Sequence, residues 1–470
     1  MNTTAAGAVN NGTGTYGAAT GGTKTLVPAV NFVDNGIIMI AVDMDNSSIW
    51  WGNDGTWAGS GNPAGNSNAV YTNLPRQVVP FQSLYSDSAT YNFGATDFAH
   101  TPPIGFKALN TANLPAPTVT PSEFFQVLDH THDGSSSTFT LNWDPTVHDT
   151  MLMFKDQDDD STNWYYSQTL YLGLQYPKTL PNLIAGSSQD TNFVSVSGTT
   201  VTVGSTLPSS DYAVYCWRFG QISSRVSNSV AGAVQIASTT SVASHGGAGL
   251  CLYEGVSGAS DSVAKVLTHG MGSSGIGWFV YENWEQAHSP IHMHSSRANR
   301  NTHTIVPATA AAESNQFGYL FGGGTYPTGA TLSAGSQLIT DGAGKDLILW
   351  MFNEVDGFIK IGKYTGGGTS FPYVHTGFSP ALIIIKRTDA SSNWVLRDNL
   401  RSPFNPSDEN LAWNLSDNED ASGGDIDFLA NGFRPCENEA TVNASGGTYE
   451  YIAFASQPFG GDGVAQAKAR

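Results

Sequence analysis

Charged side chains are scarce in this sequence, since Asp, Glu, Lys and Arg make up only 13% of its 470 residues. Runs of the residues that favour helices are also almost absent, which argues against a helical protein. Thr, Val, Tyr, Phe and Trp recur instead in short bursts, separated by the Gly, Ser, Asn, Asp and Pro that turns require. This alternation predicts an all-β chain of many short strands.

Basic residues are particularly few, with 20 Lys and Arg against 39 Asp and Glu and a net charge of −19. A nucleic-acid-binding protein needs a cationic surface, and an anionic membrane would repel this chain. The longest apolar runs, such as residues 37–42, are far too short to span a bilayer. We therefore expect no nucleic-acid partner and no membrane insertion, and the N-terminus shows no pattern of a secretory signal.

Cysteine is nearly absent, since Cys216, Cys251 and Cys436 are the only three. They cannot all pair, and none lies at the C-x-x-C spacing of metal or redox sites. The sequence predicts three reduced thiols, with Cys216 facing a core, which suits assembly in a reducing cytoplasm.

Three stretches of the chain open in the same way, at residues 123–155, 249–280 and 357–386. Each has a short apolar strand, a Gly/Ser/Thr turn, a polar strand, a break and a strongly apolar strand. Each also closes on an apolar strand, at residues 212–217, 347–352 and 449–454. Look-alike strands arise in any all-β chain, but the agreement of opener, closer and spacing favours a triplicated domain. The period is too long for a solenoid unit, whose repeats run roughly 20 to 50 residues.

These similarities divide the chain into modules. We predict tandem β-sandwiches of a jelly-roll or concanavalin-like kind, named here repeat 1 (residues 123–219), repeat 2 (247–356) and repeat 3 (357–458). Between and after them we predict a Pro-rich linker at 115–122, a connector at 220–246 and a fraying tail at 459–470.

Residues 36–114 carry a distinctive turn and aromatic pattern. A buried strand leads to Asp43-Met44-Asp45-Asn46, an aromatic strand follows at Ile49-Trp50-Trp51, and then comes Asn53-Asp54-Gly55-Thr56-Trp57. The Asn, Asp and Gly residues suit hairpin turns, and the tryptophans supply core area. This pattern resembles the second half of a SPRY domain as found in virion proteins of tailed phages. The first half is missing or reduced to residues 1–35, as an arm or incomplete sandwich, which leaves completion by a partner chain open.

Repeat 3 carries the second resemblance. Its motifs are EVDGF (354–358), KYTG (363–366), IIIK (383–386), NW (393–394) and NASGGTY (443–449). Together they resemble a β-rich repeat that follows SPRY modules in phage tail proteins. The resemblance implies a virion location and no particular activity.

Few residues suggest chemistry. The sequence has no HExxH, GxSxG, P-loop or Rossmann fingerprint, and residues 342–346 suit a turn better than a phosphate loop. Asp156, Asp158 and Asp160 alternate as calcium ligands can, or form a solvated acidic loop after an apolar strand. His288, His292 and His294 cluster, and the last two share a face if they lie on a strand. Such a pair can bind a transition metal, or pack in an interface that protonation near pH 6 would tune.

Aromatic residues near polar loops offer another kind of site. Trp164-Tyr165-Tyr166, Trp284 and Trp394 can stack on sugar rings or pack in cores and subunit interfaces. Carboxylate pairs for glycoside hydrolysis need a separation in space that a sequence does not give. We therefore assign no catalytic, cofactor-binding or metal-binding residue and expect no enzyme and no cofactor.

The resemblances and the composition together lead to one functional expectation. The chain is expected to be a structural protein of a bacteriophage virion, a tail fibre or receptor-binding appendage that mediates host attachment, made in the host bacterial cytoplasm. A homotrimer is expected, because fibre proteins associate about an axis and a truncated sandwich leaves edges to cover. Other virion proteins and a host surface glycan are the other expected partners. Two alternatives stay open: a capsid decoration or head-fibre protein, and a tailspike-type glycan-degrading enzyme.

Overall fold

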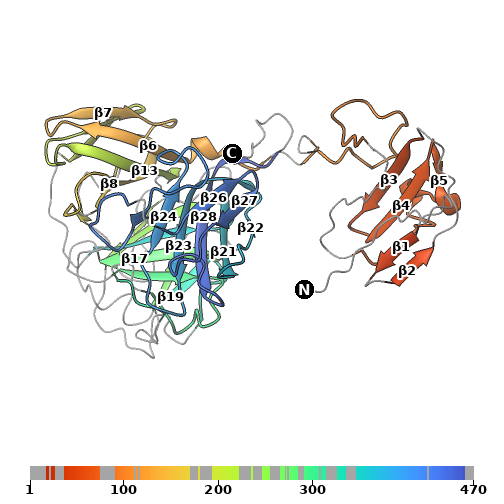
Figure 1. The fold of residues 1–470 in the computed structure, drawn as a ribbon. Helices are drawn as coiled ribbons and strands as arrows, with labels where there is room; N and C mark the ends of the chain where they lie inside the picture. Colours follow the sequence, from red (N-terminus) through yellow and green to blue (C-terminus); the bar gives the residue numbers. More distant parts are fainter. Residues whose placement is uncertain are drawn as a thin grey trace. The chain divides into compact units, whose positions relative to one another are not determined.

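The computed structural model of the chain describes residues 17–20, 23–26, 36–74, 90–110, 113–114, 117–162, 164–169, 178–179, 193–221, 234–236, 246–254, 265–269, 271, 275–283, 290–305, 309–313, 325–334, 346–420 and 423–460. Two compact units are present, Met1–Leu114 and Pro115–Arg470 (Figure 1). The described residues form strands, short 3-10 turns and no α-helix, which confirms the predicted all-β class. No helix in this part of the chain is long and apolar enough to cross a membrane.

In the N-terminal unit, strands β3 (Ile38–Asp43), β4 (Ser48–Asn53) and β5 (Thr56–Trp57) form one antiparallel sheet. Asp54 and Gly55 adopt positive φ in the turn between β4 and β5, as the Asn-Asp-Gly stretch predicts. Trp50 and Trp51 are buried. The 3-10 turns η1 (Ala58–Ser60) and η2 (Pro63–Gly65) follow.

Within the predicted arm at residues 1–35, β1 (Gly17–Thr20) and β2 (Thr23–Leu26) pair as an antiparallel hairpin. The remaining residues of that segment lie outside the described part of the chain. The unit therefore contains a small sheet and a separate hairpin among its described residues.

The C-terminal unit contains three five-stranded antiparallel sheets, one for each predicted repeat. The 3-10 turn η4 (Pro121–Glu123) leads into the first sheet, which has the order β10 (Lys178–Thr179), β9 (Tyr165–Gln168), β8 (His148–Asp156), β13 (Ser210–Gln221), β6 (Phe125–His132). The second has the order β14 (Val234–Ile236), β15 (Ala248–Glu254), β20 (Asp346–Phe352), β17 (Trp278–Asn283), β18 (Ile291–His294). The third has the order β21 (Ile359–Thr365), β28 (Thr448–Pro458), β23 (Phe378–Arg387), β24 (Val395–Asp398), β25 (Leu411–Ala412).

Each large sheet is accompanied by a small one. In repeat 1 the small sheet consists of β11 (Val194–Ser197), β12 (Thr200–Val203) and β7 (Ser137–Thr140). In repeat 2 it consists of β16 (Lys265–Thr268) and β19 (Thr331–Ala334). In repeat 3 it consists of β22 (Val374–His375), β27 (Gly432–Pro435) and β26 (Ile426–Leu429).

The three repeats share one strand order. In each large sheet the closing strand lies between the opening strand and the strongly apolar strand. On its other side, the strongly apolar strand pairs with the strand that follows it in the sequence. These series are β6-β13-β8-β9, β15-β20-β17-β18 and β21-β28-β23-β24. In each small sheet, the strand after the opener pairs with the strand before the closer. The same chain path is thus followed three times.

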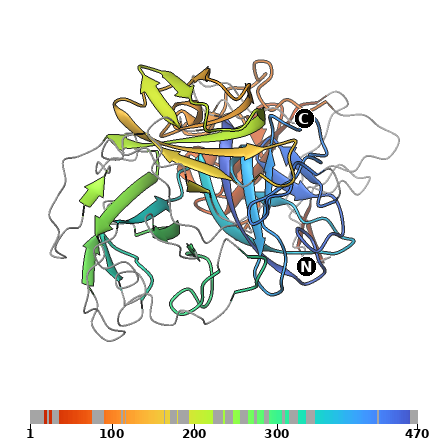
Figure 2. The same cartoon turned by 90° about the vertical axis from the view of Figure 1, so that its left-hand side faces the viewer.

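Apolar side chains bury both faces of the large sheets. In repeat 1, Leu152 and Phe154 on β8 pack toward the small sheet, whereas their neighbours Met151 and Met153 join a core that all three repeats share. At this shared core, the ring of Phe454 in repeat 3 stacks on Phe125 of repeat 1, with 5.1 Å between centroids. It also meets Phe352 of repeat 2 edge-on at 5.4 Å. Figure 2 shows the three repeats, coloured yellow, green and blue along the chain, around this common centre.

Two predicted boundaries differ from the structure. The predicted connector 220–246 contains β14, which pairs with β15 and adds a fifth strand to the sheet of repeat 2. The predicted linker 115–122 contains the first residues of η4, whose first residue Pro121 is buried. Both segments lack the long apolar runs of the other strands, so their sequences gave no periodic signal.

Candidate functional site

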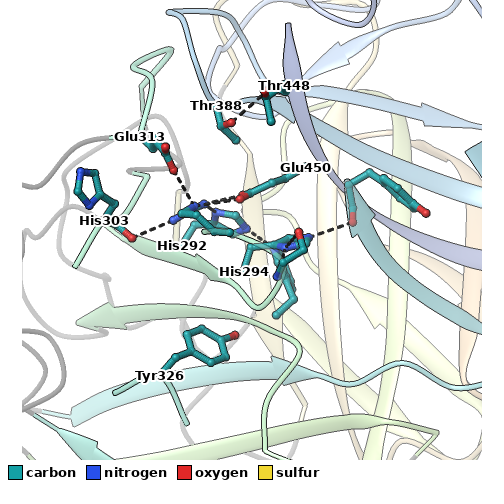
Figure 3. A network of polar contacts seen from close by, with 12 residues as sticks. His292, His294, His303, Glu313, Tyr326, Thr388, Thr448 and Glu450 are labelled. Carbon is teal, nitrogen blue, oxygen red and sulfur yellow. Dashed lines mark hydrogen bonds and ion pairs between the residues drawn. The ribbon is translucent and has the colours of Figure 1, made fainter. Parts of the chain in front are cut away.

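Buried polar side chains gather where the large sheet of repeat 2 meets that of repeat 3 (Figure 3). His292 and His294 lie on β18, Arg297 lies three residues after that strand, and Glu450 lies on β28 of the next repeat. All four are buried, at 1–3% relative exposure. Burial of charge is costly unless the charges are paired, so the contacts of this cluster decide whether the two repeats stay together.

Arg297 holds the cluster together. Its Nη2 donates to Glu450 Oε2 at 2.6 Å and its Nε to Glu450 Oε1 at 3.0 Å, a two-pronged contact. Its Nη1 donates to the main-chain oxygen of His303 at 3.1 Å, and Glu313 Oε2 lies 3.4 Å from Nε. The main chain follows the same path, since Glu313 N donates to Thr388 O of repeat 3 at 2.9 Å. One guanidinium therefore ties β18 and its following loop to β28.

His292 is held between two hydrogen-bond donors. The indole Nε1 of Trp278 donates to His292 Nε2, and Nη2 of Arg297 lies 3.4 Å from His292 Nδ1. A neutral imidazole has one acceptor nitrogen, and a protonated one has none. Burial lowers the pKa of His292 well below its usual value, and the nearby Arg297, His294 and Lys386 lower it further. The neutral form of His292 is therefore favoured.

His294 uses both of its ring nitrogens as well. Its Nε2 lies 3.2 Å from the main-chain oxygen of Tyr451, and its Nδ1 accepts from Ser296 Oγ at 2.8 Å and from Ser296 N at 3.2 Å. Burial lowers the pKa of His294, although Glu450 opposes this effect. Since all four ring nitrogens of the pair face protein groups, the pair is not arranged for metal binding. Among the described residues no group of three or more His, Cys, Asp or Glu is placed to hold a metal ion.

Lys386 completes the cluster from β23. Its Nζ donates to the main-chain oxygens of Ser392 and of Ala310, the latter in repeat 2 at 3.1 Å. Burial lowers the pKa of Lys386 to about 8. A cavity of about 10 Å³ lies between Lys386, His292 and Glu450, roughly the space that a single water molecule needs.

A related contact joins repeats 3 and 1. Arg401, three residues after β24, donates through Nε to Asp398 Oδ2 at 2.6 Å and through Nη1 to Glu419 Oε2 at 3.0 Å. Asp398 Oδ2 also accepts from the hydroxyl of Tyr215 in repeat 1 at 2.8 Å. The main chain again crosses, since Glu419 N donates to Gln157 O of repeat 1 at 3.0 Å. Arg401 and Glu419 thus occupy in repeat 3 the places of Arg297 and Glu313 in repeat 2.

A buried lysine recurs as well. Lys155 occupies the penultimate position of β8, as Lys386 does in β23. Its Nζ donates to the main-chain oxygens of Thr162 and, across to repeat 3, of Ser416 at 2.9 Å. Burial lowers its pKa to about 8. Each lysine therefore links two repeats: Lys155 links repeat 1 to repeat 3, and Lys386 links repeat 3 to repeat 2.

Comparison with known families adds one finding. The family described as "Domain of unknown function (DUF7483)" matches residues 120–458. The chain belongs to the DUF7483 family. No curated protein and no solved structure matches the chain. The DUF7483 match spans all three repeats, which agrees with their sharing one hydrophobic core as a single folded body.

The acidic loop of this DUF7483 protein is organised by its own hydrogen bonds. Asp156 Oδ1 accepts from the main-chain nitrogens of Asp158 and Asp159, both at 3.0 Å, and from Ser210 Oγ at 2.6 Å. Asp159 in turn accepts from Ser161. Asp156 is buried, whereas Asp158 and Asp160 are exposed. The loop is thus a closed turn that presents acidic side chains to solvent.

The aromatic residues suggested for sugar stacking lie inside the DUF7483 body. Trp164, Tyr166 and Trp394 are buried, and Trp164 Nε1 donates to Ala412 O of repeat 3 at 3.2 Å. They pack in the shared core, the other role predicted for them. Trp284, His288 and residues 342–345 lie outside the described residues. Cys216 packs in the core of repeat 1, as predicted, and burial raises the pKa of its thiol.

Sequence inspection missed the residues that join the DUF7483 repeats. Arg297, Glu450 and Arg401 were not among the candidates, although a signal was present. A lysine near the end of the most apolar strand occurs in repeats 1 and 3, where a lone surface charge is unexpected. An arginine also follows the next strand by three residues in repeats 2 and 3. Aligning the repeats with each other would have identified both positions.

Proposed function

We propose that this chain is a structural protein of a bacteriophage virion, a tail-fibre-type or receptor-binding appendage that contributes to host adhesion. The observation that supports this proposal best is the use of its buried polar groups. Arg297 with Glu450, Tyr215 with Asp398, and the two buried lysines join one repeat to the next. Such internal ties suit a rigid body that bears mechanical load. The SPRY-like pattern of residues 36–114 and the repeat motifs agree with a particle protein made in the host cytoplasm.

Location on the particle is tested by labelling. Purified virions carrying antibody against the C-terminal unit are expected to show label on the tail in negative-stain images. Label on the capsid surface would contradict the fibre proposal and favour the decoration-protein alternative. Incubation of the protein with host polysaccharide tests the tailspike alternative, since release of reducing ends would show a glycan-degrading enzyme.

Trimer formation is proposed to use the N-terminal unit. The three apolar side chains of β3 that alternate onto one face, Ile38, Ile40 and Val42, are 37–59% exposed, and β3 is an edge strand among the described residues. We expect the full-length protein to be a trimer by light scattering and the Ile40→Asp variant to be a monomer. Ile104→Asp is the matched control, because Ile104 is 89% exposed in the same unit. An unchanged mass in Ile40→Asp would contradict this role of β3.

Adhesion to a host glycan would need an exposed ring, and Tyr373 offers one. Its side chain is 49% exposed, and its hydroxyl is fixed by hydrogen bonds to Asn431 O at 3.1 Å and Asn431 Oδ1 at 2.7 Å. Tyr373→Ala is expected to weaken binding to host polysaccharide about twofold to twelvefold, which corresponds to the loss of about 0.5–1.5 kcal/mol of stacking. Glycan-array or surface-plasmon titration measures the effect. Phe404→Ala, at an 81% exposed ring, serves as the control, and equal binding by both variants would remove Tyr373 from the contact.

A further inference from the structure

Histidines lie at the centre of only one of the two polar repeat contacts described above. His292 and His294 lie between repeats 2 and 3, whereas the contact between repeats 3 and 1 has Asp398 at the place of His294. The correspondence follows from the strand pairing, since Trp278 is opposite His294 and Leu382 is opposite Asp398 on the equivalent strands. The two contacts therefore share the same strand arrangement. They differ in their titratable groups, because histidines lie at the contact between repeats 2 and 3 and Asp398 lies at the contact between repeats 3 and 1.

Protonation of His292 is opposed by the geometry around it. Both groups at its ring nitrogens, Trp278 Nε1 and Arg297 Nη2, are donors, so a second ring proton would face an N–H group. The new charge would also lie beside the cations Arg297 and Lys386. The positive charge would compete with Arg297 for Glu450, the carboxylate of repeat 3 that contacts the guanidinium.

The other titratable groups near the two imidazoles do not remove this conflict. They come from β23, β28 and the segments that connect the strands: Lys386, Glu450, Tyr451, Glu313, Tyr326 and Glu354. Glu450 and Glu354 favour a proton on His294, but Glu450 is already paired with Arg297. At neutral pH the cations Arg297 and Lys386 are balanced by Glu450 and Glu313, and Glu354 is paired with Lys360, so a proton on a histidine adds a charge beyond that balance.

We propose that the contact between repeats 2 and 3 is an acid-sensitive joint, in which protonation of His292 and then of His294 separates β18 from β28 while each sheet stays paired. The separation exposes both buried imidazoles to water and takes the Lys386 cation, which repeat 3 carries, away from His292. This inference goes beyond the proposed function, because it concerns the response of the body to acid wherever the protein resides.

The sign of the effect follows from linkage. A histidine whose pKa is lowered in the closed state binds its proton more readily once the joint opens, so the stability of the joint is present above about pH 6.5 and is lost as the pH falls. Each such proton raises the open fraction about tenfold per pH unit below that value. The contact between repeats 3 and 1 should respond differently. There, Asp398 takes the place of His294, and no histidine is among the groups described above that join the two repeats.

Hydrogen exchange of the full-length protein at pH 7.5 and pH 5.5, corrected for the intrinsic exchange rate, tests the joint. The amides of Glu313 and Ser392, whose main-chain hydrogen bonds cross between repeats 2 and 3, are expected to lose at least about tenfold protection at pH 5.5. The amide of Glu419, whose hydrogen bond crosses between repeats 3 and 1, is expected to change less than twofold. His292→Gln, combined with His294→Asn, keeps acceptors at the same places without a titrating ring and is expected to abolish the response. His375→Gln, at an exposed histidine, is expected to respond like the wild type.

Three results would overturn the proposal. One is unchanged protection of the Glu313 and Ser392 amides in the wild type between the two pH values. Another is an undiminished response in the double variant. If that variant does not fold, the wild-type comparison still decides, because an equal acid loss of protection at the Glu419 amide would show a global effect and no specific joint.

Discussion

Replacing Glu450 with Gln is expected to destabilise the C-terminal unit by about 3–5 kcal/mol, because the buried guanidinium of Arg297 loses its two-pronged carboxylate contact and keeps only the longer one with Glu313 at 3.4 Å. Both side chains are almost completely shielded from water, so solvent cannot replace the lost partner. Chemical denaturation monitored by tryptophan fluorescence measures the change in the free energy of unfolding.

Two further variants separate loss of a pair from loss of packing. Removing both charges, with Arg297→Met and Glu450→Leu together, is expected to recover most of the stability, since a buried pair replaced by apolar residues is often neutral. Lys360→Met breaks an ion pair with Glu354 that is 38% and 47% exposed, and should cost at most about 1 kcal/mol. If Glu450→Gln costs no more than Lys360→Met, the pair between Arg297 and Glu450 is not what joins the repeats.

Phe454→Ala is expected to destabilise the same unit by about 3–5 kcal/mol and to loosen all three repeats. The ring of Phe454 contacts Phe125 and Trp217 of repeat 1 and Phe352 of repeat 2, with centroid distances of 5.1, 5.7 and 5.4 Å. The cavity left behind adds to the lost transfer energy, because a core shared by three sheets cannot collapse around it freely. Chemical denaturation gives the size of the loss, and hydrogen exchange shows where it falls.

The control for this substitution is an exposed ring. Phe404→Ala removes a phenylalanine that is 81% exposed in repeat 3 and should change the stability by no more than about 0.5 kcal/mol. Loss of protection confined to repeat 3 in Phe454→Ala would show that the three repeats fold as independent modules. Loss in all three would show one cooperative body, as the shared core indicates.

The sugar-stacking candidates show what the sequence left open. Trp164 and Trp394 stand beside polar residues in the sequence, as exposed rings often do. Their surroundings became apolar only when a second and a third repeat packed on the same face of the sheet, because Trp164 lies against Ala412 of repeat 3 and Trp394 lies edge-on to His292 of repeat 2. Local composition carries no information about such distant neighbours.

The predicted histidine pair illustrates the opposite case. Alternation along a strand placed His292 and His294 on one face, and β18 confirms that they lie on one strand. Their ring nitrogens, however, are engaged by Trp278, Arg297, Ser296 and the main chain of Tyr451. The two-residue period of a strand predicts which side chains share a face of the sheet. It does not predict which other segments of the chain pack against that face.

The amino-acid sequence by itself determined the all-β class, the hairpin turns of residues 43–57 and the opening and closing strands of each repeat. These features depend on turn chemistry and on a two-residue period, which act over a few neighbouring residues. Only the tertiary structure decided that three large sheets share one core and that Arg297 meets Glu450, which is 153 residues away in the chain. The physical reason is that a period of two assigns each side chain to a face, while the partner of that face is chosen by the packing of whole sheets.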